Sequence, residues 1–253
     1  MAIRSCGKEY ESEIDFQIAF TKFSTISFKS DNLQTVDLQT VYNSFYLCAG
    51  MVNGYDKSYG IIHHVYVYRN AVRILEGFED LHHLFEIVAC ASLLYGVVTD
   101  RHPDRIDANN KRLNNFLQIN SLQINSPQQN AFGKNVRWII DNLNMISCHP
   151  DPSVNTAKNI VFDAITLETI GKRGLIRLRD SIIIKYPNST HDEVFQMFIK
   201  QCKEERKSLP LFIIDKAREI GIKYHTYMLN FIDNSNEKCL FLLDDVEDSI
   251  KFY

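Results

Sequence analysis

The stretch FEIVACASLLYGVV, Phe85 to Val98, decides the fold class of this chain. It is apolar on almost every side, and a helix with that character is buried inside a protein. We therefore predict a central buried helix over about residues 80–98. Its longest uncharged run, Ile87 to Val98, is too short to span a bilayer, so we do not expect it to be a membrane segment.

The sequence on both sides of this stretch repeats apolar residues at helical spacing. On the N-terminal side we predict helices over 38–51, with Gly54 as a stop, and over 61–77. On the C-terminal side Thr190 and Glu193 have the spacing of a capping box, which predicts a helix start. After the central helix, residues 108–119 form an amphipathic segment. The helices predicted beyond it span 135–145, 156–186 as one or two helices interrupted near Gly171 and Gly174, 190–207, and 210–232.

These patterns predict a mostly α fold of seven or eight helices around one core. Residues 1–36 would form an irregular or β-leaning N-terminal extension, 37–232 the helical domain, and 233–253 a C-terminal tail. The extension is ambiguous, because Phe16, Ile18 and Phe20 alternate as in a strand, whereas Phe16, Phe20 and Phe23 would share one face of a helix. Both alternatives are open at this point.

Composition and charge restrict the class of partner. Hydrophobic residues make up 45% and charged residues 23%, as in an ordinary globular chain. The net charge of −3 provides no general attraction to nucleic acid or to an anionic membrane, so we expect neither as a partner. The six cysteines lack zinc or redox spacing and the N-terminus lacks an apolar leader, which favours reduced thiols in the cytoplasm or inside a virion. The many Ile and Asn residues are favoured by AT-rich codons, such as those of a large DNA virus.

Several motifs follow one another in a characteristic order along residues 38–232. They are DKSYGIIH at 56–63, YRNA at 68–71, CASLLYGVVTDR at 90–101, IIDNLNMIS at 139–147, VFDAITLETIGKRGLIR at 161–177, and a last helix with Ala217, Gly221, His225 and Met228. In this order they resemble the HD-domain superfamily of metal-dependent phosphohydrolases, and most closely its YpgQ/YedJ-like branch, which includes nucleotide pyrophosphatases. The resemblance implies an HD-like helical bundle.

The metal ligands that this resemblance implies are mostly replaced. An HD site uses a His, an adjacent His-Asp pair and a later Asp, and the matching positions here hold His63, Tyr95, Gly96 and Ile165. Glycine and isoleucine side chains have no donor atom, and a tyrosine phenol stays protonated at neutral pH. A single histidine does not hold a catalytic metal, and without the metal no water is activated. We therefore expect no metal, no cofactor and no catalytic residue.

The remaining residues of interest form two groups, both placed by the resemblance. The relic pocket contains His63, Tyr95, Gly96, Asp100, Asp163 and Ile165. A possible anion-binding group contains Arg101, Lys172 and Arg177, because a guanidinium can hold a phosphate without any metal. The alternative is a solvated basic face around GKRGLIRLRD, which also includes Arg173. We expect a closed pocket in which Tyr95 packs near Ile165 and the aspartates neutralise the arginines.

Three hypotheses about function follow. The first is a catalytically inactive HD-fold protein that binds another protein, or forms a homo-oligomer, through its N-terminal extension or C-terminal tail. The second is a sensor that binds a nucleotide or another phosphate compound through Arg101, Lys172 and Arg177 without a metal. The third is an active phosphohydrolase with a metal site rebuilt around His63, Asp100, His102 and Asp163.

Overall fold

The part of the chain that the structure describes is mostly helical. A computed structural model describes residues 15–26, 38–52, 60–98, 103–122, 131–205, 208–234 and 240, and no strand occurs in these ranges. The prediction of a mostly α fold is confirmed. None of the helices in these ranges is both long and apolar enough to cross a membrane.

The internal contacts divide the chain into two compact units, residues 1–165 and 166–253. The division falls near the end of α7 (Pro152–Glu168). This is one division within the helical part of the chain, whereas the prediction divides the chain into an extension, a domain and a tail at residues 36 and 232. Those two boundaries stay a prediction.

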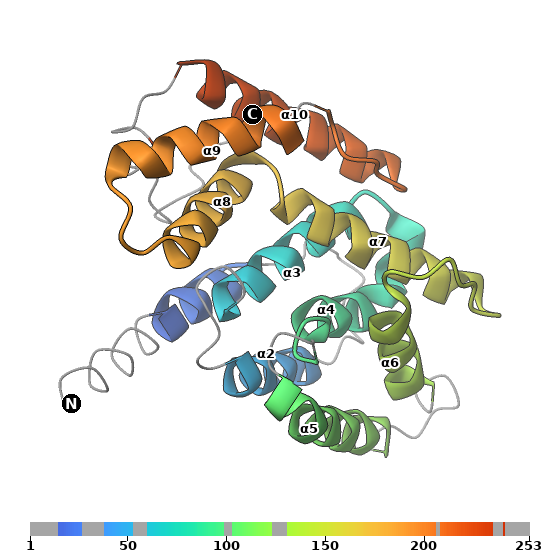
Figure 1. The fold of residues 1–253 in the computed structure, drawn as a ribbon. Helices are drawn as coiled ribbons and strands as arrows, with labels where there is room; N and C mark the ends of the chain where they lie inside the picture. Colours follow the sequence, from blue (N-terminus) through green and yellow to red (C-terminus); the bar gives the residue numbers. More distant parts are fainter. Residues whose placement is uncertain are drawn as a thin grey trace, which may run out of the picture. The chain divides into compact units, whose positions relative to one another are not determined.

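The first unit is built around α4 (Phe85–Leu94), which packs against α2 (Leu38–Val52), α3 (Ile61–Leu75) and α6 (Phe132–Asn142), as Figure 1 shows. Eight of its ten residues are buried, which confirms the predicted central helix. The helix is shorter than predicted, because a 3-10 helix, η2 (Glu79–Leu84), comes directly before it.

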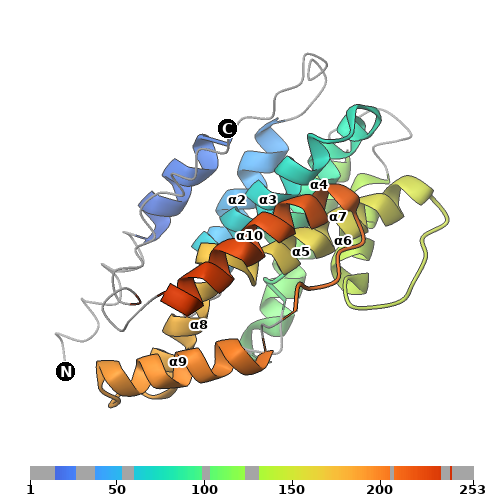
Figure 2. The same ribbon diagram turned by 90° about the horizontal axis from the view of Figure 1, so that it is seen from above.

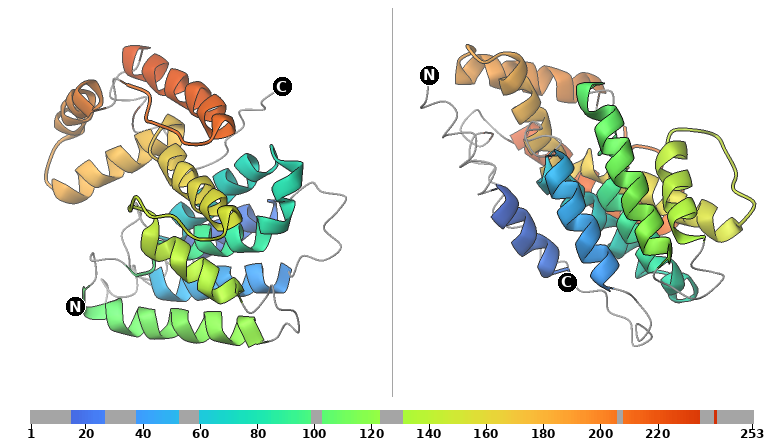
Figure 3. Two further views of the ribbon diagram at one scale, coloured as in Figure 1. Left: turned by 90° about the vertical axis from the view of Figure 1, so that its right-hand side faces the viewer. Right: turned by 90° about the horizontal axis from the view of Figure 1, so that it is seen from below.

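An outer helix, α5 (Pro103–Leu122), packs against α6 and less extensively against α2 (Figure 3). It exposes most of its surface and buries a narrow apolar stripe that includes Leu113 and Leu117. The groove between α5 and α6 therefore lies at the surface of this unit.

Residues 15–24 form a helix beside α2 (Figure 2), so the strand alternative is wrong for these residues. The rings of Phe16, Phe20 and Phe23 lie 5.7, 5.8 and 4.6 Å from that of Phe45 on α2, and Ala19 between them is fully buried. Burial on one helical face outweighs the strand preference of the flanking Ser and Thr residues.

The second unit contains α8 (Gly171–Lys185), α9 (His191–Glu205) and α10 (Asp215–Asn234). Helix α8 packs against both of the others. The three helices enclose an apolar core made of Leu175, Ile176, Leu178, Ile182, Val194, Phe198, Cys202, Met228 and Leu240.

The predicted helical segment 156–186 is two helices, and Gly171 separates them. Its φ angle is +68°, a conformation that strongly favours glycine, and a Cβ there would lie 3.1 Å from Cβ of Tyr224. The prediction of one or two helices there included this split. The helix at 15–24 and α5 raise the number of α-helices in the described ranges above the seven or eight predicted.

Candidate functional site

The relic pocket is centred on a contact between the start of α3 and the end of α4. His63 lies in the first turn of α3, and Tyr95 is the residue that follows α4. The Tyr95 hydroxyl and Nε2 of His63 are hydrogen-bonded, with the two rings nearly perpendicular and their centroids 5.8 Å apart. Nε2 of His63 is therefore engaged by Tyr95, which stands where the predicted HD motif has a histidine.

Gly96 lies against a second imidazole, that of His64. A Cβ at Gly96 would be 2.8 Å from Cε1 and 3.2 Å from Nε2 of His64. The Tyr95 ring also contacts His64, with 5.2 Å between centroids. An aspartate at position 96, as the HD motif has it, would require His64 to move.

Both histidines are enclosed by protein. His63 is 3% exposed and His64 1% exposed, so the imidazoles are almost out of reach of solvent. Consecutive residues of an α-helix point about 100° apart around its axis, so the two imidazoles leave α3 in different directions. Tyr95 nevertheless contacts both rings, because it lies where α4 ends beside α3.

Helix α7 contributes Asp163, which is fully buried, and Ile165, which is half-buried. Between them, the Ala164 carbonyl accepts a hydrogen bond of 3.4 Å from the Asn70 side chain on α3. This hydrogen bond joins α3 to α7 at Asn70 and Ala164. The expected packing of Tyr95 near Ile165 stays a prediction.

Asp100, Arg101 and His102 lie outside the described residues. The predicted pairing of these aspartate and arginine residues, and any rebuilt metal site that includes them, are therefore untested. Within the described ranges, no group of three or more His, Cys, Asp or Glu side chains is arranged to hold a metal ion. The described residues of the relic pocket do not fit a metal, because Tyr95 engages Nε2 of His63 and Gly96 and Ile165 offer no donor atom.

The basic residues of α8 belong to the second unit. Lys172 and Arg177 are half-buried, whereas Arg173 is buried and forms an ion pair of 3.4 Å with Glu168. The interpretation of this cluster as a solvated face is therefore wrong for Arg173. Burial is the largest influence on the Glu168 carboxyl and raises its pKa above the ordinary value, while Arg173 and Arg177 act in the opposite direction.

Glu168 and His64 are not among the site residues predicted from the sequence. Glu168 stands five residues before Arg173 in the motif at 161–177. An acidic residue so close to several cations could have predicted their ion pair. His64 had no comparable signal, because only the packing of α4 against α3 brings Gly96 to its ring.

Neither models of protein families, nor curated protein sequences, nor solved structures give a match to this chain. The resemblance to the HD superfamily therefore stays a prediction carried by the quoted motifs. Any functional conclusion has to rest on the described residues and their chemistry.

Proposed function

We propose that this chain is a catalytically inactive protein of HD-like fold that acts by binding another protein, in the cytoplasm or in a virion. The observation that carries the proposal is the hydrogen bond between Tyr95 and Nε2 of His63. A metal approaching Nε2 of His63 would have to displace the phenol, and the side chains of Gly96 and Ile165, at the other two predicted ligand positions, offer no ligand atoms.

Because Tyr95 engages Nε2 of His63, a catalytically inactive protein is favoured over a metal-dependent enzyme whose metal has not yet bound. Without a metal there is no Lewis acid and no water of lowered pKa, and hydrolysis of a phosphate ester at neutral pH loses its nucleophile. A helical fold that cannot catalyse metal-dependent hydrolysis can still bind another protein through its surface.

The metal-independent sensor is the main alternative, and it depends on the free charge of the α8 cations. Glu168 offsets part of that charge through its ion pair with Arg173 and its proximity to Arg177. A phosphate would therefore compete with an internal carboxylate, which makes binding of a phosphate compound the weaker proposal.

A thermal-shift panel separates the three functions. Purified chain would be heated with Mn²⁺ alone, with nucleotides alone and with both, and phosphate release would be measured alongside. We expect no shift and no release. A shift with nucleotides alone would favour the sensor, and a metal-dependent shift with phosphate release would contradict the proposal.

A gain-of-ligand variant provides the matched control. Tyr95→His, Gly96→Asp and Ile165→Asp together restore the motif's donor atoms, and we expect Mn²⁺ to raise the melting temperature of this variant but not that of the parent chain. The metal-free variant should melt below the parent, because position 96 has no room for a side chain beside His64. An unchanged melting temperature would show that the pocket is open and hydrated.

A further inference from the structure

One long stretch of the sequence, residues 108–140, contains no aspartate and no glutamate, although the whole chain has 31 acidic residues. Its charged residues are four cations, Lys111, Arg112, Lys134 and Arg137. The net charge of −3, on which the expectation against a nucleic-acid partner rests, is an average that conceals this local excess of positive charge. A local excess of this kind attracts a polyanion whatever the charge of the rest of the chain.

The same stretch is rich in side-chain amides. It holds 8 of the 20 asparagines and 4 of the 9 glutamines of the chain, within 33 of the 253 residues. The general abundance of asparagine in this chain does not account for so uneven a distribution. An amide side chain both donates and accepts hydrogen bonds, as a nucleic-acid base does, whereas a surface of carboxylates only accepts them. The composition of the stretch therefore fits a nucleic acid better than an acidic protein.

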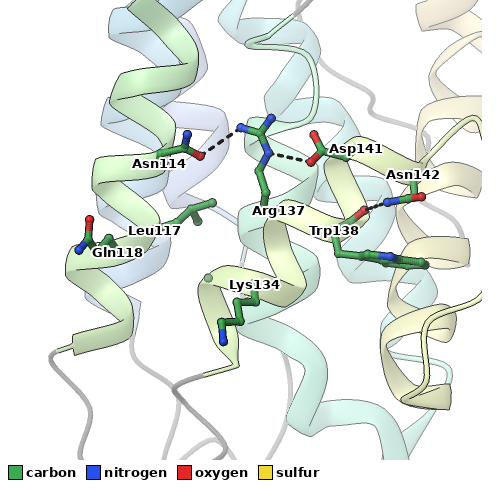
Figure 4. A pocket seen from close by; sticks show the side chains of 9 residues that line it. Asn114, Leu117, Gln118, Lys134, Arg137, Trp138, Asp141 and Asn142 are labelled. Atoms are coloured by element: carbon green, nitrogen blue, oxygen red, sulfur yellow. Dashed lines mark hydrogen bonds and ion pairs between the residues drawn. The ribbon is translucent and has the colours of Figure 1, made fainter.

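The described parts of this stretch lie in α5 and α6, which pack against each other. A groove of about 530 Å³ lies between the two helices. In Figure 4, Asn114, Leu117 and Gln118 approach it from α5 and Lys134 from α6. We call this hollow the α5–α6 groove. Lys111 stands about two helical turns before Gln118 and so lies on the same side of α5, which places cations of both helices beside the groove.

Arg137 connects the two walls of the groove. Its Nη1 atom donates hydrogen bonds to Oδ1 of Asn110, at 2.9 Å, and to Oδ1 of Asn114, at 3.2 Å, while its Nε atom lies 2.8 Å from a carboxylate oxygen of Asp141. The guanidinium is therefore used within the protein, and the exposed Asn114 has its NH2 group left to donate to a partner. A groove held together in this way loses little conformational entropy when a ligand binds.

The other three cations of the stretch, Lys111, Arg112 and Lys134, have a different environment. Their side chains are exposed, and none of them forms an ion pair with another residue that the structure describes. A phosphate group can approach each of them without displacing an internal carboxylate. These three residues therefore supply the positive charge that Arg137 does not.

The shape and the lining of the groove favour a single strand over a duplex. In a duplex the Watson–Crick edges of the bases are paired with each other, whereas a single strand presents them to amide side chains. A convex double helix also does not enter a hollow of about 530 Å³, but an unpaired nucleotide can.

We propose that the α5–α6 groove binds single-stranded nucleic acid. Lys111, Arg112 and Lys134 contact phosphate groups, and the amides of Asn114 and Gln118 contact bases. The inference goes beyond the proposed protein-binding function and does not rest on it, because none of these residues belongs to the relic pocket.

The first test titrates the full chain with single-stranded oligonucleotides of mixed sequence, RNA in one series and DNA in the other. Trp138 is the only tryptophan of the chain and lines the groove, so its fluorescence reports a ligand at this surface. We expect a saturable change in fluorescence and a dissociation constant that rises with salt concentration, because phosphate contacts release counterions. The absence of binding to both RNA and DNA at low salt would overturn the inference.

Charge reversal locates the site. Lys111→Glu combined with Lys134→Glu should raise the dissociation constant at least about tenfold, and the salt dependence should weaken by about one logarithmic unit of slope for each lost phosphate contact. Lys200→Glu with Lys203→Glu is the matched control, because both lysines are exposed on α9 in the other unit and the net charge changes equally. Circular dichroism would verify that both variants fold. An equal loss of binding in the two variants would overturn the inference.

An amide variant tests the base contacts separately from the charge. Gln118→Ala should weaken binding but keep the salt dependence, because no phosphate contact is lost. Asn115→Ala is the control, since Asn115 is equally exposed on α5 but does not line the groove. Unchanged affinity of Gln118→Ala would contradict a strand seated in the groove.

Competitors identify the class of ligand. A duplex of the same sequence and polyglutamate should each displace the single strand poorly. Tighter binding of the duplex, or displacement by polyglutamate at equal charge concentration, would overturn the inference in favour of a duplex or an acidic protein. A mononucleotide should not compete, because it is too short to reach the cations of both helices. The expected thermal-shift result with nucleotides is therefore unaffected, and failure of this inference can be told apart from failure of the proposed function.

Discussion

Tyr95 and His63 are hydrogen-bonded through the phenol oxygen and Nε2 where α3 and α4 pack together. The HD motif that the sequence resembles has a metal-binding histidine at each of these two positions. Here the two side chains bind each other instead. This hydrogen bond should also stabilise the fold, and its contribution to the free energy of unfolding can be measured whatever the function is.

Tyr95→Phe should destabilise the fold by about 1 kcal/mol, because it removes the hydrogen bond from the buried His63 ring. Urea unfolding monitored by circular dichroism would measure the loss. Tyr186→Phe is the control, since Tyr186 is 42% exposed and its change should have little effect. Equal stability of Tyr95→Phe and the parent would show that water replaces the hydroxyl.

Gly96→Ala should destabilise the fold by about 1–3 kcal/mol, because the new methyl group would lie 2.8 Å from the His64 ring. Gly50→Ala is the matched control in α2, where a Cβ has no neighbour within 4 Å. That change should instead stabilise by about 0.5–1 kcal/mol through helix propensity. If both alanine variants behaved alike in thermal unfolding, the contact between Gly96 and His64 would not restrict position 96.

Arg173→Met should destabilise the second unit in a pH-dependent way. Burial raises the pKa of Glu168, and Arg173 opposes that rise, so removing the guanidinium should raise the pKa further. A carboxyl with a raised folded pKa lowers stability as the pH rises from its ordinary value through the folded value. The loss should be on the order of 3 kcal/mol near neutral pH and smaller in acid, where Glu168 is protonated in both states.

Urea unfolding of this variant at acidic and neutral pH would measure the difference. Lys216→Met removes the exposed ion pair with Glu219 and should cost less than about 1 kcal/mol at either pH. A loss for Arg173→Met that did not depend on pH would indicate that lost packing, rather than the charge of Glu168, dominates.

Thr190→Ala should destabilise α9 by about 1 kcal/mol, because Thr190 accepts a hydrogen bond of 3.3 Å from the Glu193 amide at the helix start. The Glu193 carboxylate accepts hydrogen bonds from the Thr190 amide at 2.7 Å and from the Thr190 hydroxyl at 3.0 Å, and these two bonds lower its pKa. The contribution of Glu193 is present above the ordinary glutamate pKa and is lost as the pH falls through the lowered value. Thr190→Ser should retain the stability, and an equal loss in the serine variant would point to the methyl group instead.

The elements that were predictable from sequence are those whose signal is local. The largely apolar stretch at 85–98 predicted a buried helix, and the spacing of Thr190 and Glu193 predicted a helix start that the structure confirms. The helix at 15–24 was ambiguous, because Phe16, Phe20 and Phe23 satisfy a helical face only once Phe45 is there to receive them.

The amino-acid sequence by itself determined the helical class, the central helix and the lack of side-chain donor atoms at positions 96 and 165, since each depends on side-chain chemistry or on residues close in the chain. Only the tertiary structure decided what replaced the site. The bond between Tyr95 and His63 and the close approach of Gly96 to His64 join residues about 32 positions apart, and both arise from how α3 packs against α4. The register of two packed helices depends on the shapes of all their side chains together, and no motif within either helix specifies it.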